Sequence, residues 1–318
     1  MLKVLSLFSG VGGIDLPFEE EGFKVIYAND FDQFAVQTYN ENFEVGATLA
    51  DITKVDPKDL PNADVLIGGF PCQPFSIAGY RKGFEDTRGT LFFNVANILK
   101  EKKPSVILLE NVKNLVSHDN GNTFEVILNT LKELGYHVKY SVLNACEYGN
   151  MPQNRERIYI VGFLDEECYR YFDFPEPIRL TKTIYDVIDF ENKVDSKYYY
   201  TEAKYPKIYN AFKKVEAKEG IVYQWRRVYV RSNKSGVVPC LTANMGTGGH
   251  NVPLVYTKHG LRKLTPRECF NVQGFPLDYK LPSISDAHLY KQAGNSVCVG
   301  VIRRIVQNIN IALKKGKK

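Results

Sequence analysis

The sequence predicts an α/β protein with a doubly wound, mostly parallel sheet, followed by a smaller, irregular, β-rich domain. Three observations support this fold class. An apolar run of strand length at 2–8 ends in a glycine turn and continues into a short helix, which is the first unit of a doubly wound fold. Apolar runs of strand length then alternate with helical stretches as far as residue 163. Beyond 174–177, where two prolines flank a glutamate, this alternation stops.

The first units carry features of a nucleotide site. The glycine turn consists of Gly10, Gly12 and Gly13. Its spacing matches neither the dinucleotide fingerprint nor a P-loop. The second strand, 24–29, ends at Asp30, about 20 residues after the turn, where an acid accepts hydrogen bonds from ribose hydroxyls. A third unit ends at Asp51 and Ile52. We therefore expect a cofactor that contains adenosine.

A cysteine between two prolines follows the fourth strand. The fourth strand, 64–67, contains the apolar run 65–67, ends at two glycines and leads to Pro71, Cys72 and Pro74. Parallel strands deliver ligand-binding residues at their carboxyl ends, and the prolines fix the backbone on both sides of the thiol. Cys72 is thus a candidate reactive group, although a buried cysteine in a tight turn would read similarly. The basic, glycine-punctuated loop 76–89 has the character of a lid.

A fifth strand brings a carboxylate to the same edge. The elements expected after the lid are a helix at 90–102, a strand at 104–109, a helix at 122–134 that stops at Gly135, and strands at 137–143 and 157–163. The strand 104–109 delivers Glu110 beside Cys72. Glu110 is a candidate acid or base, and the alternative is that it caps a helix, a role that Asn111 would serve equally well.

Charge is divided unevenly along the chain. Residues 179–285 contain 18 lysines and arginines against 9 acidic residues, whereas the rest of the chain has 23 against 27. A basic segment of this kind favours a polyanion, and nucleic acid is the usual one. We expect a first domain at 1–178, a second at 179–285, and a C-terminal segment, 286–318, that packs back on the first.

Composition restricts the class of protein further. No apolar run approaches the roughly 20 residues of a membrane span, so we expect a cytoplasmic protein. The six cysteines are scattered, without metal-ligand or disulfide spacing, at positions 72, 146, 168, 240, 269 and 298. We expect free thiols and no metal site.

Six blocks occur in the order found in cytosine-5 DNA methyltransferases, and they span almost the whole chain. They are Phe8-Ser9-Gly10-Val11-Gly12-Gly13, Gly69-Phe70-Pro71-Cys72-Gln73, Glu110-Asn111-Val112, Gln153-x-Arg155-x-Arg157, Arg262-x-Leu264-Thr265-Pro266-Arg267-Glu268 and Gly294-Asn295-Ser296-Val297. On these blocks the chain resembles a bacterial cytosine-5 DNA methyltransferase of a restriction-modification system. The resemblance implies the S-adenosylmethionine-dependent methyltransferase fold, with S-adenosylmethionine as methyl donor and S-adenosylhomocysteine as product.

The resemblance assigns a catalytic set of Cys72, Glu110, Arg155 and Arg157. Cys72 would add to C6 of cytosine, because C5 takes a methyl group only after a nucleophile has added to the ring. The two arginines or backbone amides would favour the thiolate. Glu110 would hold the ring at N3 and the exocyclic amine and supply a proton to N3.

The resemblance also assigns a cofactor site at the strand ends. Its residues are Phe8, Gly10, Gly12, Gly13, Asp30, Phe31, Asp51, Ile52, Pro71, Leu91, Asn295 and Ser296. Relatives often carry glutamate and tryptophan where this chain has Asp30 and Phe31. Both replacements keep the chemistry, since an acid still accepts hydrogen bonds from hydroxyls and an aromatic ring still stacks.

Double-stranded DNA is the expected partner, and the target base must be flipped out of the stack. The DNA-binding residues expected in the lid and the basic domain are Ser76, Arg81, Arg88, Arg226, Arg227, Arg231, Thr242, Asn244, Gly248 and Gly249. Cys240 stands where the family usually has threonine. The recognition segment looks most like those that read G/C-rich palindromes such as GCNGC or CCNGG. We expect a monomer that modifies each half of a palindrome in separate visits.

Three other functions remain open from the residues. A cytosine-5 methyltransferase acting on tRNA would share the catalytic blocks, but the sizeable basic segment favours DNA. A non-catalytic DNA-binding regulator would be expected to lose Cys72, Glu110 or the glycine turn, and all are present. A cysteine hydrolase would need a histidine in an activating motif, which none of the five histidines occupies.

Overall fold

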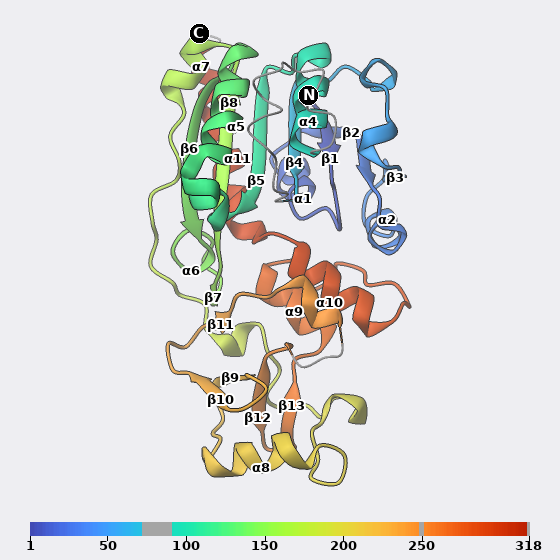
Figure 1. Cartoon of the computed structure of the whole chain (residues 1–318), viewed down its shortest axis with the longest axis vertical. Helices are drawn as coiled ribbons and strands as arrows, with labels where there is room; N and C mark the ends of the chain where they lie inside the picture. The colour runs from blue at the N-terminus through green and yellow to red at the C-terminus, as the bar shows by residue number, and fades with distance from the viewer. Residues whose placement is uncertain (72–90, 248–250, 317–318) are drawn as a thin grey trace. The chain divides into compact units, whose positions relative to one another are not determined.

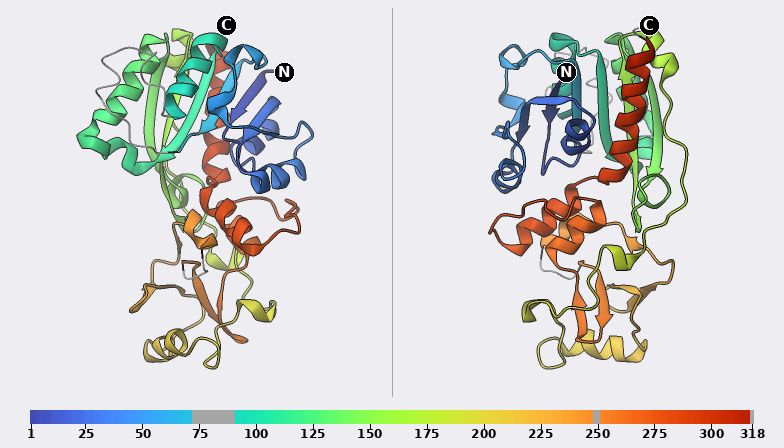
Figure 2. Two further views of the ribbon diagram at one scale, coloured as in Figure 1. Left: turned by 45° about the vertical axis from the view of Figure 1, so that its right-hand side comes forward. Right: turned by 180° about the vertical axis from the view of Figure 1, so that it is seen from behind.

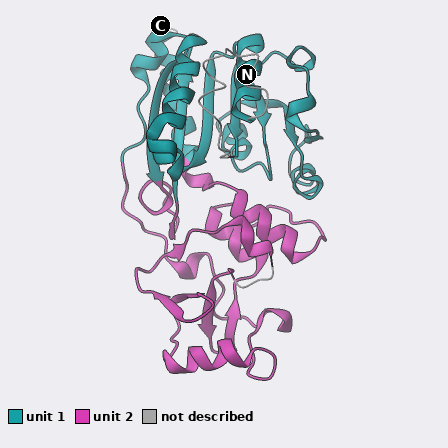
Figure 3. Ribbon diagram, in the orientation of Figure 1, with its two compact units in different colours: residues 1–143, 156–176, 302–318 teal, residues 144–155, 177–301 magenta. Residues whose placement is uncertain are grey.

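The computed structural model describes residues 1–71, 91–247 and 251–316, and the chain divides into two compact units. Unit 1 comprises residues 1–143, 156–176 and 302–318, and unit 2 comprises residues 144–155 and 177–301 (Figure 3). The chain passes between the units four times. Neither unit is therefore a single continuous segment.

Unit 1 is built on a mixed sheet of seven described strands. In chain order these are β1 (Lys3–Leu7), β2 (Lys24–Asp30), β3 (Thr48–Leu49), β4 (Val65–Gly69), β5 (Val106–Val112), β6 (His137–Asn144) and β8 (Glu156–Phe163). Their order across the sheet is β3-β2-β1-β4-β5-β8-β6. All pairs from β3 to β5 are parallel, and β8 runs antiparallel to β5. The predicted α/β class with a mostly parallel sheet is confirmed.

Helices cover both faces of this sheet. They are α1 (Asp15–Glu20), α2 (Gln33–Asn40), α4 (Leu91–Lys102), α5 (Asn122–Glu133), α7 (Glu166–Tyr171) and α11 (Val299–Gly316), the last of which begins in unit 2. In Figure 1, α4 and α5 lie in front of the strands, and the right panel of Figure 2 shows α11 against the opposite face. Leu66, Ile107 and Leu109 from the strands pack with Phe92 of α4 and Ile127 of α5 in one buried core.

The strand order reverses between β1 and β4. From β1 the chain moves outward through β2 and β3, and it returns to the other side of β1 with β4 and β5. In open α/β sheets, ligands bind beyond the carboxyl ends of the strands at such a reversal. Phe8, Pro71 and the end of β5 therefore belong to the edge where a ligand is expected.

Helix α11 has an apolar face along its length. Ile302, Ile305, Val306 and Ile309 recur at helical spacing and are fully buried. An 18-residue part of the stretch Asp286–Gly316 is long and apolar enough to cross a membrane, but 61% of that part is buried inside the protein. The core helix of a globular protein has the same length and composition, so this stretch is weak evidence for a membrane span.

Unit 2 combines small sheets with short helices. Its strands are β7 (Gln153–Asn154), β9 (Val222–Trp225), β10 (Val230–Asn233), β11 (Val238–Pro239), β12 (Leu254–Thr257) and β13 (Gly260–Lys263). The order β10-β9-β12-β13 forms an antiparallel sheet, and β7 pairs in parallel with β11. The helices are α6 (Ala145–Tyr148), α8 (Pro206–Lys214), α9 (Pro266–Gln273) and α10 (Asp286–Asn295). Trp225, Tyr223 and Phe212 belong to the core between the sheet and α8.

The start of α9 shows how sequence sets an element of unit 2. Thr265 caps the helix, Pro266 occupies its first position, and the Glu268 side chain returns to the Thr265 N–H at 2.7 Å. Glu268 also forms a two-point ion pair with Arg262 of β13, at 2.7 and 2.8 Å. Both side chains are almost completely buried. The pair holds β13 and α9 together.

Replacing Glu268 by glutamine is expected to destabilise unit 2 by about 3–5 kcal/mol, because the Arg262 guanidinium would keep its burial and lose its counter-charge. Thermal or urea unfolding followed by circular dichroism measures this loss. The matched control is Glu202→Gln, since Glu202 pairs with Lys213 at 3.3 Å on the surface and should change stability by about 1 kcal/mol or less. Equal stabilities of the two variants would contradict the structural role of the pair.

The unit boundaries depart from the sequence-based domains in two places. Residues 144–155, expected in the first domain, belong to unit 2, because β7 pairs with β11. Residues 286–301, expected to return to the first domain with the rest of the tail, also belong to unit 2. There Tyr290 donates a hydrogen bond to the Leu264 carbonyl, and Ala293 accepts one from Gln273. From Ile302 onward the tail is part of unit 1.

Candidate active site and nucleic-acid surface

Glu110 lies near the carboxyl end of β5, between two neighbouring strands. It is in register with Gly69 of β4 on one side and with Tyr159 of β8 on the other. Apolar residues precede it, and only 8% of Glu110 is exposed. A Cβ atom on Gly69 would lie 3.3 Å from Glu110 Oε2, so the glycine leaves room for the carboxylate. The predicted acid therefore stands beside the strand that leads to Cys72.

An arginine from β8 pairs with this carboxylate. Arg157 Nε lies 3.1 Å from Glu110 Oε1, and both side chains are largely buried. The contact arises because β8 runs antiparallel to β5, with Arg157 opposite Val112, two residues from Glu110. Arg157 is predicted to favour the Cys72 thiolate, and that role stays a prediction. Among the described residues its guanidinium pairs with Glu110 and donates to the Glu156 carbonyl at 2.8 Å, so it helps to fix the Glu110 carboxylate.

Asn111 ties β5 to the backbone that precedes the cysteine. Its side-chain amide donates a hydrogen bond to the Phe70 carbonyl at 2.8 Å, and both residues are buried. From sequence, Asn111 is predicted only as a possible helix cap. Its contact fixes the chain one residue before Pro71, so it is a positioning residue that the sequence analysis missed. Cys72 itself lies outside the described residues, together with Ser76, Arg81 and Arg88.

A cavity of about 440 Å³ opens at the carboxyl ends of the first strands of unit 1. It is lined by Phe8, Asn29, Phe31, Leu49, Ala50, Asp51, Ile52 and Leu91. Its volume is within the range of small-molecule sites. Phe31 is 71% exposed, so its ring presents a free aromatic face. Five predicted cofactor residues meet here, and Asn29, Leu49 and Ala50 are lining residues that the sequence analysis missed.

Asp30 joins the glycine turn to the end of β2. Its two carboxylate oxygens accept hydrogen bonds from the N–H groups of Gly10 and Asp32, each at 2.9 Å. Burial raises the pKa of Asp30, and these hydrogen bonds act in the opposite direction. Gly12 has φ +72°, and a Cβ atom there would strike the ring of Phe43 at 2.1 Å. The turn therefore requires glycine at position 12, and Asp30 fixes its backbone through the Gly10 N–H. Gly13 is the next residue along the chain.

Asp51 is an exposed acceptor at the rim of the cavity. It caps the short 3₁₀ turn Ile52–Lys54 and accepts hydrogen bonds from the Thr53 hydroxyl at 2.8 Å and the Thr53 N–H at 3.0 Å. These bonds lower the pKa of Asp51, and the bond from the Thr53 hydroxyl has a larger effect than the bond from the Thr53 N–H. The carboxylate is therefore ionised and fixed in direction.

Arg155 lies in unit 2 and contacts main-chain carbonyls. Its guanidinium is buried and donates to Leu241 O at 2.8 Å, to Gly294 O at 3.3 Å and to Ser296 O. It also lies 3.4 Å from the Cys240 sulfur. Three separate segments of unit 2 are joined at this one side chain. Its contacts are those of a positioning residue.

The remaining predicted cofactor residues do not line the described cavity. Pro71 follows β4 in unit 1, whereas Asn295 ends α10 and Ser296 follows it in unit 2. Their assignment to the cofactor stays a prediction. Within 1–71, 91–247 and 251–316, no group of three His, Cys, Asp or Glu side chains could hold a metal ion.

A second cavity, of about 440 Å³, lies in unit 2 and is lined mainly by polar side chains. We call it the polar hollow. Four predicted DNA-binding residues line it: Arg226, Arg231, Thr242 and Asn244. Cys240 lines it too, beside amide side chains including Asn154, Gln224 and Asn251. Arginine, amides and hydroxyls are the groups that read base edges. Arg227 does not line the polar hollow, and Gly248 and Gly249 lie outside the described residues.

Comparison with known proteins gives consistent matches over nearly the whole chain. The family model for C-5 cytosine-specific DNA methylase matches residues 2–310. Type II methyltransferase M.Bsp6I of Bacillus sp. (strain RFL6) is 58% identical over 97% of this chain and 98% of its own length. Type II methyltransferase M.HhaI of Haemophilus parahaemolyticus is 42% identical over 98% of this chain and 95% of its own length.

Solved structures share the fold. A crystal structure of a DNMT2 variant from Spodoptera frugiperda has a TM-score of 0.74 at 22% identity, covering 98% of this chain and all of its own. The S. pombe Dnmt2 methyltransferase has a TM-score of 0.73 at 21% identity, covering 99% of this chain and all of its own. At these identities the likeness concerns the fold alone.

Proposed function

Because the chain belongs to the C-5 cytosine-specific DNA methylase family and is an enzyme that methylates cytosine in DNA at C5, we propose that Cys72 forms a covalent adduct with C6 of a flipped-out cytosine. A thiolate is the side chain best suited to this addition, which makes C5 nucleophilic. Taking the base out of the duplex costs a few kcal/mol. The observation that carries the proposal is the buried Glu110–Arg157 pair at the carboxyl ends of β4 and β5, beside the strand that leads to Cys72.

In this proposal Glu110 binds the target base. Its carboxyl group contacts N3 and the exocyclic amine of cytosine and supplies a proton to N3 as electrons move toward C5. Arg157 holds Oε1 and so orients the carboxyl group. Asn111 holds the Phe70 carbonyl and so fixes the backbone ahead of Cys72. Arg155 has a positioning role: its hydrogen bonds to the carbonyls of Leu241 and Gly294 join its own segment to two others in unit 2.

The cavity in unit 1 fits S-adenosylmethionine, whose sulfonium centre supplies the methyl group. Asn29 lines the cavity, and its Oδ1 is buried without a hydrogen-bond partner among the described residues, so a donor from a ligand would satisfy it. The exposed face of Phe31 suits a purine, and Asp51 is an ionised acceptor at the rim. Asp30 uses one site on each oxygen for a backbone N–H, and the other lone pairs can accept from ribose hydroxyls.

We further propose that the enzyme is the modification partner of a restriction-modification system, acting as a monomer in the cytoplasm. The relatives described above are Type II methyltransferases that align over nearly their whole length. The polar hollow of unit 2 would meet the bases of a short duplex sequence through Arg226, Arg231 and Asn244. A monomer suffices because each half of a palindrome can be modified in a separate visit.

Transfer of labelled methyl from S-adenosylmethionine to duplex DNA and, in parallel, to tRNA tests this function. We expect label in DNA, recovered as 5-methylcytosine, and sequencing of the product would give the site. Label in tRNA alone would instead assign the chain to RNA modification. A folded protein that binds the donor and labels neither substrate would be a non-catalytic binder, and the proposal would be wrong.

A further inference from the structure

A β-hairpin projects from the sheet of unit 2. Strands β9 and β10 pair from Trp225 and Val230 onward, and the tip 226–229 is closed by a hydrogen bond from Arg226 N–H to Tyr229 O at 2.9 Å. A second bond, from Val228 N–H to Arg226 O, closes a three-residue turn in which Arg227 has φ +63°. All four residues of the tip are exposed, and Val228 is 81% exposed. The tip is thus a tightly closed, strained turn that faces solvent.

The two arginines of the tip line different hollows. Arg226 lines the polar hollow, whereas Arg227 lines a separate groove of about 420 Å³, which we call the α8 groove. The α8 groove is lined by Tyr205, Pro206, Lys207, Ile208, Trp225 and Arg227. Trp225 lines both hollows, so the two adjoin at the base of the hairpin.

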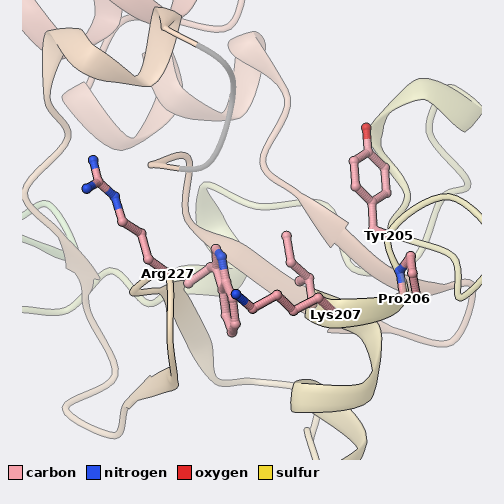
Figure 4. Close-up of a pocket in the computed structure, with 6 residues that line it drawn as sticks. Tyr205, Pro206, Lys207 and Arg227 are labelled. Carbon is pink, nitrogen blue, oxygen red and sulfur yellow. The ribbon is translucent and has the colours of Figure 1, made fainter.

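The α8 groove has an apolar floor and a cationic rim. Ile208 and Trp225 are buried residues, whereas Lys207 and Arg227 are exposed. In Figure 4 the Lys207 side chain extends toward the hairpin that carries Arg227, and the Arg227 guanidinium and the Tyr205 phenol rise on the same side. No carboxylate is among the lining residues. In the part of the chain that the structure describes, the ion pair on α8 joins Lys213 to Glu202 and does not involve Lys207.

We propose that the α8 groove holds the sugar–phosphate backbone of duplex DNA that flanks the recognition sequence. Deoxyribose offers C–H faces to an apolar floor, and the phosphates on either side of it need cations, which Lys207 and Arg227 supply. Lys204, whose ammonium lies 5.6 Å above the Tyr205 ring, extends the positive edge. The inference rests on the proposed function, because a duplex whose bases meet the polar hollow has its backbone beside the same hairpin.

If this contact forms, the affinity of the enzyme for DNA should depend on how far the duplex extends beyond the recognition site. Affinity is measured by fluorescence anisotropy at several salt concentrations, on a long duplex and on duplexes shortened on one side or the other. The native enzyme should lose affinity when one flank is removed. Lys207→Gln should weaken binding to the long duplex by about fivefold and reduce the salt slope by about 1, because one phosphate contact is lost. On the duplex that lacks this flank, the variant and the native enzyme should bind equally.

Two further variants make the test specific. Lys214→Gln removes the same charge from the other end of α8, outside the groove, and should match the native enzyme on every duplex. Arg227→Asn removes the second rim charge and keeps a residue that tolerates positive φ, so it should behave like Lys207→Gln. Native behaviour of Lys207→Gln and Arg227→Asn on the long duplex would overturn the proposal.

Equal losses for Lys207→Gln and Lys214→Gln on all duplexes would also overturn it, since they would indicate a general electrostatic field. In either case the native enzyme would still methylate DNA, so the failure would concern the α8 groove alone. Absence of methylation and of DNA binding by the native enzyme would overturn the proposed function and this inference together.

Discussion

Replacing Cys72 by serine is expected to lower the rate of methyl transfer by about 10⁴-fold or more, because losing a nucleophile removes the covalent route altogether. A serine hydroxyl is not ionised at neutral pH and adds poorly to the cytosine ring. Single-turnover transfer of labelled methyl to duplex DNA measures the effect.

A second readout separates loss of the adduct from loss of folding. DNA with fluorine at C5 of the target cytosine should trap the native enzyme in a complex that survives denaturation, since the C5 proton that must leave is absent. Cys72→Ser should form no such complex while still binding DNA. Cys146→Ser, which changes a half-buried thiol in α6, serves as the control and should keep the native rate. Native transfer by Cys72→Ser would refute the covalent mechanism.

Replacing Glu110 by glutamine is expected to lower the transfer rate by about 10²–10⁴-fold, the usual contribution of a positioned acid or base. The amide keeps the shape of the carboxyl group and can still accept a hydrogen bond from Arg157, but it cannot donate a proton to N3. The measurement is the single-turnover rate at saturating DNA and S-adenosylmethionine.

Glu156→Gln is the matched control for this variant. Glu156 is the first residue of β8, beside Arg157, and its exposed carboxylate pairs with Lys113 at 2.8 Å. It should keep the native rate, because a surface pair of this kind contributes little. If Glu110→Gln also kept the native rate, with native DNA binding, Glu110 would have no part in the chemistry.

The positions of the strands could be predicted because local apolar runs set them, whereas their ends differ by up to three residues. The strand expected at 64–67 corresponds to β4, at Val65–Gly69, and the strand expected at 104–109 corresponds to β5, at Val106–Val112. Since parallel strands end at one edge, the placement of Glu110 beside the segment before Cys72 followed from sequence alone. The contribution of Asn29 to the cavity could also have been predicted, since Asn29 directly precedes Asp30 at the end of β2.

The ion pair between Glu110 and Arg157 could not be predicted in the same way. Arg157 meets Glu110 because β8 inserts antiparallel between β5 and β6, and strand order is a long-range property that no local pattern encodes. Arg155, two residues earlier, looks equivalent in sequence and has wholly different contacts. The chain passes from unit 2 to unit 1 between Arg155 and Glu156, and nothing in the residue types marks that point.

The contacts of Arg155 have a consequence for how recognition can change during evolution. Three of its partners are peptide carbonyls, at Leu241, Gly294 and Ser296, and every residue type supplies a carbonyl. The side chains around Leu241 can therefore be replaced without removing these hydrogen bonds of Arg155 to main-chain carbonyls. In a hybrid enzyme that carries the recognition segment of a relative, Arg155 can form the same hydrogen bonds to main-chain carbonyls, provided that the backbone follows the same path. Specificity can thus diverge while the attachment of the segment remains constant.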